Sequence, residues 1–330
     1  MALVRRVLLM LGLIWAVLTV TFFMIRLVPG NPVKLQLLND IAQGMNYAQA
    51  LHEVEILFDV NLKQPLFVQY LGYLGGLLHG DLGKSVMFPQ TPIAGLIAQT
   101  LPWTLFTVTS SIIVSFVIGV VLGTAAAYRR DGWLDKLITP SSSVLNGIPN
   151  YLVGTIVLFV FAVVLRWFPT QGAYNPAVPV GFTPAFIGSA LYHGVLPIAS
   201  YVISSWALWY LLMKSNTVSV LGADFINGAR AHGVPERRIM LGYVAPNAML
   251  PLVTGVVLQL AYHFSGSVLV ETIFDYPGIG YLFTQAALNS DYSLLQALFG
   301  VLAVIIIVAN FIADILYTKL DPRIHLEDIA

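Results

Sequence analysis

Six apolar stretches, each about as long as a bilayer core requires, constrain this chain more than any other feature. A helix needs about 20 mostly apolar residues to cross the hydrocarbon layer, where its backbone polar groups must bond internally. Of the 330 residues, 58% are hydrophobic and only 10% are charged, a balance that would make a soluble protein aggregate. We therefore predict an all-α integral membrane protein with six transmembrane helices, near residues 7–28, 103–127, 141–165, 195–213, 249–270 and 294–318.

Charge and cysteine content narrow the possible functions. The formal net charge is zero, so nothing electrostatic favours nucleic acid as a partner. The chain contains no cysteine, which excludes disulfides, thiolate metal sites and cysteine nucleophiles. We expect the lipid bilayer as surroundings, and neither a catalytic residue nor a metal site in this chain.

The distribution of Lys and Arg predicts the orientation, because cytoplasmic loops carry an excess of these residues. With the N-terminus inside, eleven basic residues are cytoplasmic and four are external. We therefore expect both termini in the cytoplasm, together with the connection between the fourth and fifth spans. The first stretch is expected to stay as a membrane anchor, because no small-x-small cleavage site follows it.

The expected organisation follows from these spans. Two stretches outside them have helical apolar spacing and are expected to form short amphipathic helices at the membrane surface, at residues 45–58 and 64–78. Residues 169–184 and 271–293 are expected to be external loops. The predicted segments are the first span (1–28), an external segment (29–102), a core with five spans (103–318) that includes the cytoplasmic loop 214–248, and a cytoplasmic tail (319–330).

The longest polar run in the second half of the chain is ADFINGARAHGVPERRIMLGYVAPN, at residues 223–247. Asp224 is expected to cap a short helix, and Gly233 to end it in a left-handed conformation that glycine adopts without strain. Glu236 follows a proline and is expected in the first turn of a second helix.

The first of these helices carries small residues, Gly228, Ala229 and Ala231, which would let another protein approach its backbone closely. Basic residues, among them Arg230 and Arg237, surround it. A short helix of this kind on the cytoplasmic side is typical of a docking element rather than of a catalytic one. An ordinary solvated loop is the alternative interpretation.

This run resembles the EAA loop of ABC-transporter permeases, whose pattern is Glu-Ala-Ala-x3-Gly-x9-Ile-x-Leu-Pro. Ala229, Gly233 and Pro246 match the pattern. The positions that depart from it are Asn227, Gly228, Tyr243 and Ala245. The resemblance implies that this helix sits in a cleft of an ATPase subunit. It assigns the contact to Asp224, Asn227, Gly228, Ala229, Arg230, Gly233, Glu236, Arg237 and Pro246.

Further motifs resemble the B-type permease subunits of dipeptide, oligopeptide, nickel and glutathione importers. They are FFMIRLVPGNP, YLGGLLHGDLGKS, ARAHGVPERRIM, ETIFDYPGIG and ADILYTKLDPR, and they cover nearly the whole chain. The resemblance implies a type I ABC importer permease in a bacterial cytoplasmic membrane, moving peptides by alternating access. It also implies four further subunits: a homologous second permease, two ABC ATPases and an extracytoplasmic substrate-binding protein.

ATP chemistry is expected to come from the partners, because this chain has no nucleotide-binding motif. The run ending in Gly83-Lys84-Ser85 is no phosphate loop, since the glycine required five positions earlier is Leu78. We therefore expect no cofactor in this chain, with ATP and magnesium bound by the ATPase subunits. Nickel and glutathione remain alternative substrates.

Two alternatives come from other functional classes: an intramembrane hydrolase and a passive channel. His263 and Ser267 lie four residues apart and could meet on one helix face, whereas Ser265 points to another side. Nothing else in that span frames a nucleophile. Polar contacts between packed helices explain these residues better.

The substrate pathway has three candidate residues. Asn150 follows Pro149, where a bend in the third span could line a polar pathway. Glu271 and Asp275 lie in an external stretch. Like Asp291, they have no Lys or Arg near them in the sequence, so their carboxylates could attract a peptide amino group or a cation. The competing interpretation is that these acids cap helices, which suits Asp291 because it precedes an apolar run.

Overall fold

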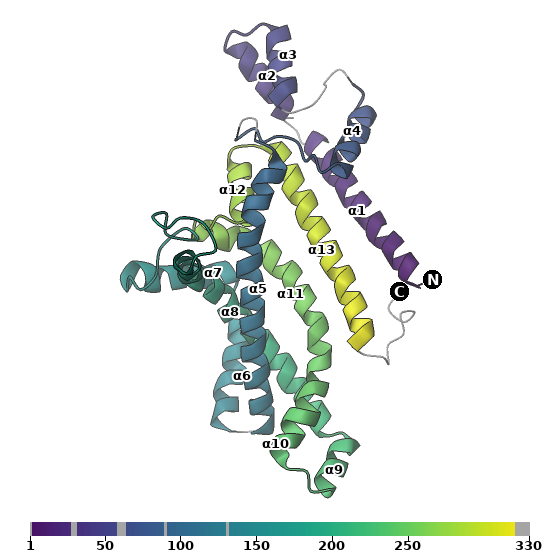
Figure 1. The fold of residues 1–330 in the computed structure, drawn as a ribbon, viewed down its shortest axis with the longest axis vertical. Helices are drawn as coiled ribbons and strands as arrows, with labels where there is room; N and C mark the ends of the chain where they lie inside the picture. Colours follow the sequence, from purple (N-terminus) through teal and green to yellow (C-terminus); the bar gives the residue numbers. More distant parts are fainter. Residues whose placement is uncertain (1, 28–31, 58–63, 89–90, 130–131, 321–330) are drawn as a thin grey trace. The chain divides into compact units, whose positions relative to one another are not determined.

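We describe the fold from a computed structural model, which places residues 2–27, 32–57, 64–88, 91–129 and 132–320. These residues are mostly helical, and their β structure is limited to a bridge between Lys84 and Pro92. The chain forms two compact units (Figure 1). The first comprises Met1–Thr104 and Pro277–Val308, and the second comprises Leu105–Tyr276 and Ala309–Ala330.

Among the described residues, four helices are long and apolar enough to cross a membrane, and two bent pairs bring the number of spans to six if each pair counts as one. The prediction of six spans is confirmed on that count. The long helices are α1 (Ala2–Leu27), α5 (Ile93–Tyr128), α8 (Pro184–Leu221) and α13 (Tyr292–Leu320).

The third span differs in its bounds from the stretch expected at residues 141–165. It starts earlier, as α6 (Trp133–Leu145), breaks, and resumes as α7 (Asn150–Val157) and the π-helix η1 (Leu158–Val164), with 106° between the two parts. Pro149 accounts for the break, because it lacks an N–H and disfavours helical backbone at the residue before it. The bend that the sequence allowed at this proline is therefore present.

The fifth span is also bent, by 50° between Val253 and Leu258. It begins with the single turn α10 (Glu236–Arg238), continues through the π-helix η2 (Ile239–Val244) and becomes α11 (Ala245–Ile273). Pro251 lies inside α11, four residues before Gly255. A proline inside a helix removes a backbone hydrogen bond and favours such a bend.

The first unit adds four shorter helices. The two predicted at residues 45–58 and 64–78 are confirmed as α3 (Tyr47–Leu57) and α4 (Leu66–Leu78). The sequence did not predict α2 (Pro32–Ala42). Residues 271–293 were expected to be a loop, which is wrong in part, because α12 (Ile279–Leu288) lies there. Its apolar residues Ile279 and Leu282 are buried with Leu294 and Leu298 of α13.

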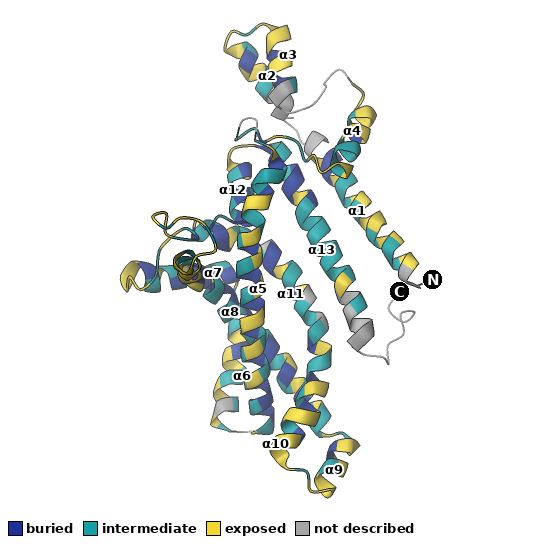
Figure 2. Ribbon diagram, in the orientation of Figure 1, coloured by how far each residue is buried: buried dark blue, intermediate teal, exposed yellow. Residues whose placement is uncertain are grey.

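In the second unit, α5 packs tightly against α8 through glycine. Gly119 and Gly123 form the small-xxx-small spacing that lets membrane helices approach closely. A Cβ on Gly119 would lie 2.3 Å from the Cβ of Trp209, and one on Gly123 would lie 2.7 Å from the carbonyl oxygen of Tyr210. No other residue fits at these two positions without moving the helices apart. Figure 2 shows the buried residues of this unit along the facing sides of its helices.

Candidate functional site

The first short helix predicted in the run at residues 223–247 is present as α9 (Asp224–Ala231), which follows the end of α8 after two residues. Asp224 was expected at the cap position, and this is wrong by one residue. Ala223 is the cap, with extended backbone (ψ 144°), and Asp224 is the first helical residue. Its carboxylate therefore lies in the first turn, where the positive end of the helix dipole favours an acid.

One face of α9 is fixed to the rest of the second unit. Ile226 is fully buried and clusters with Ile239 and Val244 of η2. Ala229, one turn further along α9, packs against the same cluster. Partly buried residues that complete the packing are Tyr128, Val220, Leu221 and Val234. The loop is therefore a built element and not a freely solvated connection.

The opposite face of α9 is exposed. Asn227 and Gly228 are exposed, and a Cβ added to Gly228 would meet no atom within 4 Å. Phe225 has 50% of its surface exposed, although it is a large apolar residue. Glycine inside a helix is less stable than alanine by about 1 kcal/mol. No contact among the described residues requires a glycine at position 228.

Gly233 ends α9 as predicted, with a left-handed φ of +74°. Its N–H donates to the carbonyl oxygen of Arg230 at 2.9 Å, and the N–H of Val234 donates to that of Ala229 at 3.1 Å. This pair of bonds is the Schellman motif, which satisfies carbonyl groups that a helix end leaves free. The turn also brings Val234 and Ala229 into contact with the same apolar cluster.

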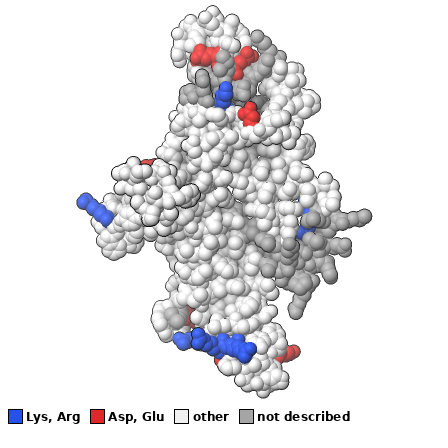
Figure 3. Space-filling model, viewed as in Figure 1, with Lys and Arg blue, Asp and Glu red and all other residues white. Residues whose placement is uncertain are grey.

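An exposed ion pair connects α9 with α10 across the turn between them. Arg230 Nε donates to Glu236 Oε1 at 2.7 Å, with 42% and 58% of the two side chains exposed. This hydrogen bond raises the pKa of Arg230 above its usual value. Arg237 is also exposed, and Figure 3 shows Lys and Arg side chains gathered at this end of the unit, over α10. Pro246 is exposed in the first turn of α11.

Asn150, a candidate for the substrate pathway, lies at a contact between helices. It is the first residue of α7 and has 6% of its surface exposed. A Cβ on Gly266 of α11 would lie 2.5 Å from Asn150 Nδ2, so the carboxamide fits only because residue 266 is glycine. In the isolated chain this side chain faces α11 and not open solvent.

The two acids near the C-terminal end of α11, Glu271 and Asp275, have different surroundings. Glu271 is fully buried within the last turn of α11, whereas Asp275 is exposed in the turn that follows, with a φ of +43°. The pKa of Tyr276 is raised by burial and, to a smaller degree, by the charge of Glu271. Of these two carboxylates, that of Asp275 is the one presented to the surroundings in the isolated chain.

Asp291, in the first unit, is fully buried and caps α13 as predicted, accepting from the N–H of Leu294 at 3.0 Å. Its other oxygen accepts from Ser85 Oγ at 2.6 Å and from the N–H groups of Val86 and Met87 at 2.8 and 3.0 Å. The sequence did not predict these bonds to a loop about 200 residues away. Asp291 therefore joins two parts of the fold and is not available to a substrate.

The geometry does not support an intramembrane hydrolase. His263 Nε2 lies 3.2 Å from Ser205 Oγ of α8, whereas Ser267 Oγ donates to the carbonyl oxygen of Phe264 at 2.8 Å. Ser205 Oγ donates to the carbonyl oxygen of Tyr201 at 2.7 Å, so it accepts from the imidazole. These are polar contacts between packed helices. Within the described residues, no group of three His, Cys, Asp or Glu could hold a metal ion.

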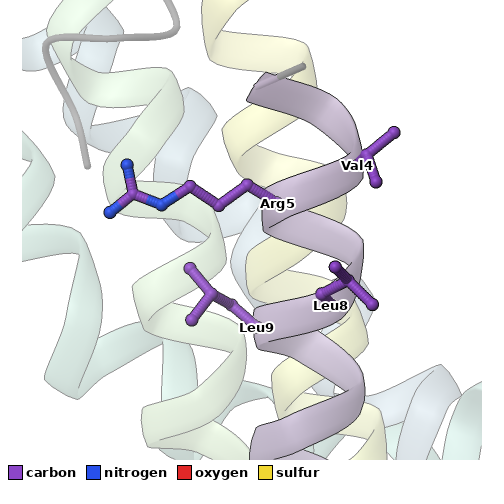
Figure 4. A pocket seen from close by; sticks show the side chains of 4 residues that line it. All are labelled: Val4, Arg5, Leu8 and Leu9. Carbon is purple, nitrogen blue, oxygen red and sulfur yellow. The ribbon is translucent and has the colours of Figure 1, made fainter.

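A hollow at the start of α1 carries no site either. Val4, Arg5, Leu8 and Leu9 line it, and all four project from one helix (Figure 4). A lining from a single helix cannot enclose a ligand. The exposed face of α9 is therefore the best candidate functional surface that the described residues offer.

Comparison with known proteins identifies the family. Residues 119–326 match the family "Binding-protein-dependent transport system inner membrane component". The oligopeptide transport system permease protein AppB of Bacillus subtilis is 34% identical over 98% of both chains. The corresponding protein OppB of Haemophilus influenzae is 30% identical, over 97% of this chain and 98% of that one.

A solved structure agrees on the fold. A chain of the MetNI methionine ABC transporter, in an inward-facing conformation, has a TM-score of 0.56 at 15% identity, over 68% of this chain and 96% of that one. The expected fold class, a helical type I ABC importer permease, is confirmed. With its family match and its full-length relatives, the chain belongs to the inner-membrane components of binding-protein-dependent transport systems.

Proposed function

We propose that this chain is the transmembrane permease subunit of an ATP-driven importer that moves di- and oligopeptides into a bacterial cell. The relatives AppB and OppB are oligopeptide transport permeases, and their likeness extends over nearly the whole chain. This makes peptide a better supported substrate class than nickel or glutathione. The chain would work by alternating access in the cytoplasmic membrane, with its termini and α9 on the cytoplasmic side.

The observation that carries the coupling proposal is the arrangement of α9. Ile226 holds its inner face to the unit, while its outer face presents Gly228 with open space around it. A glycine that weakens the helix and serves no contact among the described residues is explained by close approach of another protein. We assign that approach to an ABC ATPase subunit.

The assembly we propose contains this chain, a homologous second permease, two ABC ATPases and an external substrate-binding protein. ATP and magnesium would bind the ATPases, so this chain contributes no catalytic residue. Closure of the ATPases would displace α9, and the rigid α8 would carry that displacement into the membrane. Asp224, Asn227 and Arg237 would flank the contact, with Pro246 starting the span behind it.

On the substrate side, the exposed carboxylate of Asp275 would attract the amino group of an arriving peptide. Glu271, which is buried, and Asn150, which faces α11, would act only after a rearrangement that opens the pathway. Import of free and N-blocked peptides by Asp275→Asn tests this role. Equal import of both by the variant and the wild type would remove Asp275 from the pathway.

The docking assignment is tested by Gly228→Leu in the complete transporter reconstituted in proteoliposomes. We expect the variant to insert and fold normally, because a Cβ added at this exposed position lies more than 4 Å from every other described atom outside its own helical turn. Peptide uptake and the ATPase activity stimulated by the binding protein should both fall, because leucine holds α9 out of its cleft. Gly188→Leu is the matched control, since Gly188 is also helical, exposed and free of neighbours within 4 Å.

Wild-type uptake and ATPase stimulation in Gly228→Leu would contradict the assignment of α9. The wild-type complex distinguishes the other functional classes. A passive channel or an intramembrane hydrolase would not raise the ATPase activity of partner subunits when substrate-loaded binding protein is added.

A further inference from the structure

A polar network joins α6 to α8 in the second unit. Lys214 forms an ion pair with Asp135, and its Nζ also donates to Thr139 Oγ1 at 2.9 Å. Thr139 donates to Asp135 Oδ1 at 2.7 Å, and the hydroxyl of Tyr210 donates to the same oxygen at 3.3 Å. Asp135 and Thr139 are four residues apart on α6, as are Tyr210 and Lys214 on α8, so two helix faces meet here.

This network is not a solvated surface pair. Only 13% of the Asp135 side chain and 22% of the Lys214 side chain are exposed, and Tyr210 is fully buried. Ion pairs that are largely withdrawn from water are held by their additional hydrogen bonds, and removing one partner leaves an uncompensated charge. Lys136, the next residue on α6, is exposed and belongs to no ion pair within the described residues.

The network lies on the path from α9 to the break in the third span. From Lys214, α8 continues without interruption to Leu221, and α9 starts three residues later. Val220 and Leu221 at the end of α8 pack against the apolar cluster that holds α9. A displacement of α9 therefore acts directly on the end of α8 that carries Lys214.

The network also lies next to α5 and leads, along α6, to the break in the third span. A Cβ on Gly123 of α5 would lie 3.1 Å from the backbone nitrogen of Lys214, so α5 is held against α8 at the same level. On the other side, α6 runs from Asp135 to Leu145 and ends at the 106° break before Asn150. The ion pair thus connects the helix next to α9 with the helix that leads to the break.

We propose that Asp135 and Lys214 are positioning residues for energy coupling: they lock α6 to α8, so that a displacement of α9 reaches the break between α6 and α7. This inference rests on the proposed function, because it assumes that an ATPase subunit displaces α9. Without the lock, α8 would move with α9 while α6 lagged behind. ATP would then be hydrolysed without a matching opening of the transport pathway.

The test uses two variants. One is Lys214→Met, and the other is a double variant that exchanges the two charges, Asp135→Lys together with Lys214→Asp. The control is Lys136→Met, which removes the neighbouring exposed charge. Each variant is reconstituted in proteoliposomes with its complete set of partner subunits. The readout is the number of peptide molecules imported per ATP hydrolysed in the presence of loaded binding protein. A purely structural role would lower the amount of assembled complex and leave this ratio unchanged.

We expect Lys214→Met to keep its stimulated ATPase activity and to lower the ratio by roughly tenfold, within the usual range of coupling effects. The exchange should restore much of the ratio, and Lys136→Met should match the wild type. A wild-type ratio in Lys214→Met would overturn the inference. If that variant does not assemble, Thr139→Val decides in the same way: a reduced ratio supports the lock, and a wild-type ratio overturns it.

Failure of this inference can be separated from failure of the proposed function. If the wild-type complex shows no ATP-dependent uptake of peptides, the proposed function falls, and the lock falls with it. If the wild type imports peptides and all variants retain its ratio, only the lock is wrong.

Discussion

The loop around Asp291 and the turn after α9 both contain polar side chains next to a helix end, but they satisfy their polar groups differently. Asp291 is fully buried, and its carboxylate accepts four hydrogen bonds from Ser85, Val86, Met87 and Leu294. At the turn after α9, Arg230 of α9 and Glu236 of α10 form an exposed ion pair, and a Cβ on Gly228 of α9 would meet no atom within 4 Å.

This difference separates residues that maintain the fold from residues that we propose contact another protein. A carboxylate whose acceptor sites are all used inside the chain has no capacity left for a ligand, so Asp291 serves the fold. Helix α9 is packed against the unit on one face and exposed on the other, and we propose that the exposed face contacts another protein. The comparison predicts that substitutions at Asp291 act on stability, whereas substitutions on the outer face of α9 act on coupling.

The largest effect on stability is expected for Asp291→Asn. Asparagine has one accepting oxygen and one donating NH₂ group. The donors bonded to one of the two Asp291 oxygens therefore lose their acceptor, at a cost of about 3 kcal/mol in the free energy of unfolding. Thermal unfolding of the purified protein in detergent should show a clearly lower midpoint. Asp275→Asn is the matched control, because Asp275 is exposed and asparagine tolerates its positive φ. Equal midpoints for the two variants would contradict the role of Asp291 in maintaining the fold.

An intermediate effect is expected for Gly233→Leu. A leucine at a φ of +74° is strained by about 1–2 kcal/mol, and the turn that orients α9 is distorted. We expect a modest loss of stability together with loss of transport and of ATPase stimulation. Gly228→Leu should lose coupling without the loss of stability. If Gly233→Leu retains wild-type transport and ATPase stimulation, the docking assignment is wrong.

The smallest effect on stability is expected for Glu236→Gln. The ion pair with Arg230 is exposed on both sides, and such pairs contribute little because water and salt screen them. Its unfolding midpoint should match that of the wild type at low and high salt. A large decrease at low salt would show that the turn depends on this pair and that the outer side of α9 also maintains the fold.

Features set by local backbone chemistry could be predicted from the sequence. The apolar stretches correspond to the spans, the glycine at position 233 has the left-handed conformation, and Asp291 caps the helix that follows it. Each depends on neighbours within a few residues. The cap of α9 shifted by one residue because extended backbone at Ala223 is sufficient to start a helix without a side-chain bond.

Features set by contacts between distant residues could not be predicted. Ser85 and Asp291 are 206 residues apart, and Asp135 and Lys214 are 79 apart, so no short-range pattern connects them. The turn signal at Pro277-Gly278 obscured α12, whose stability comes from burial against α13. The spacing of Gly119 and Gly123 was a readable signal for close helix packing, and it would have indicated the contact with α8.

The central claim is that the outer face of α9 contacts an ATPase subunit, and the absence of cysteine allows a direct test. A single cysteine replaces Asn227, which is exposed on that face, or Gln171, which is exposed in the loop before α8. Each transporter is assembled with its partners and treated with a short thiol-to-amine cross-linker. We predict a covalent adduct between residue 227 and an ATPase subunit, and none from residue 171. An active transporter that forms the adduct from residue 171 but not from residue 227 would contradict the account.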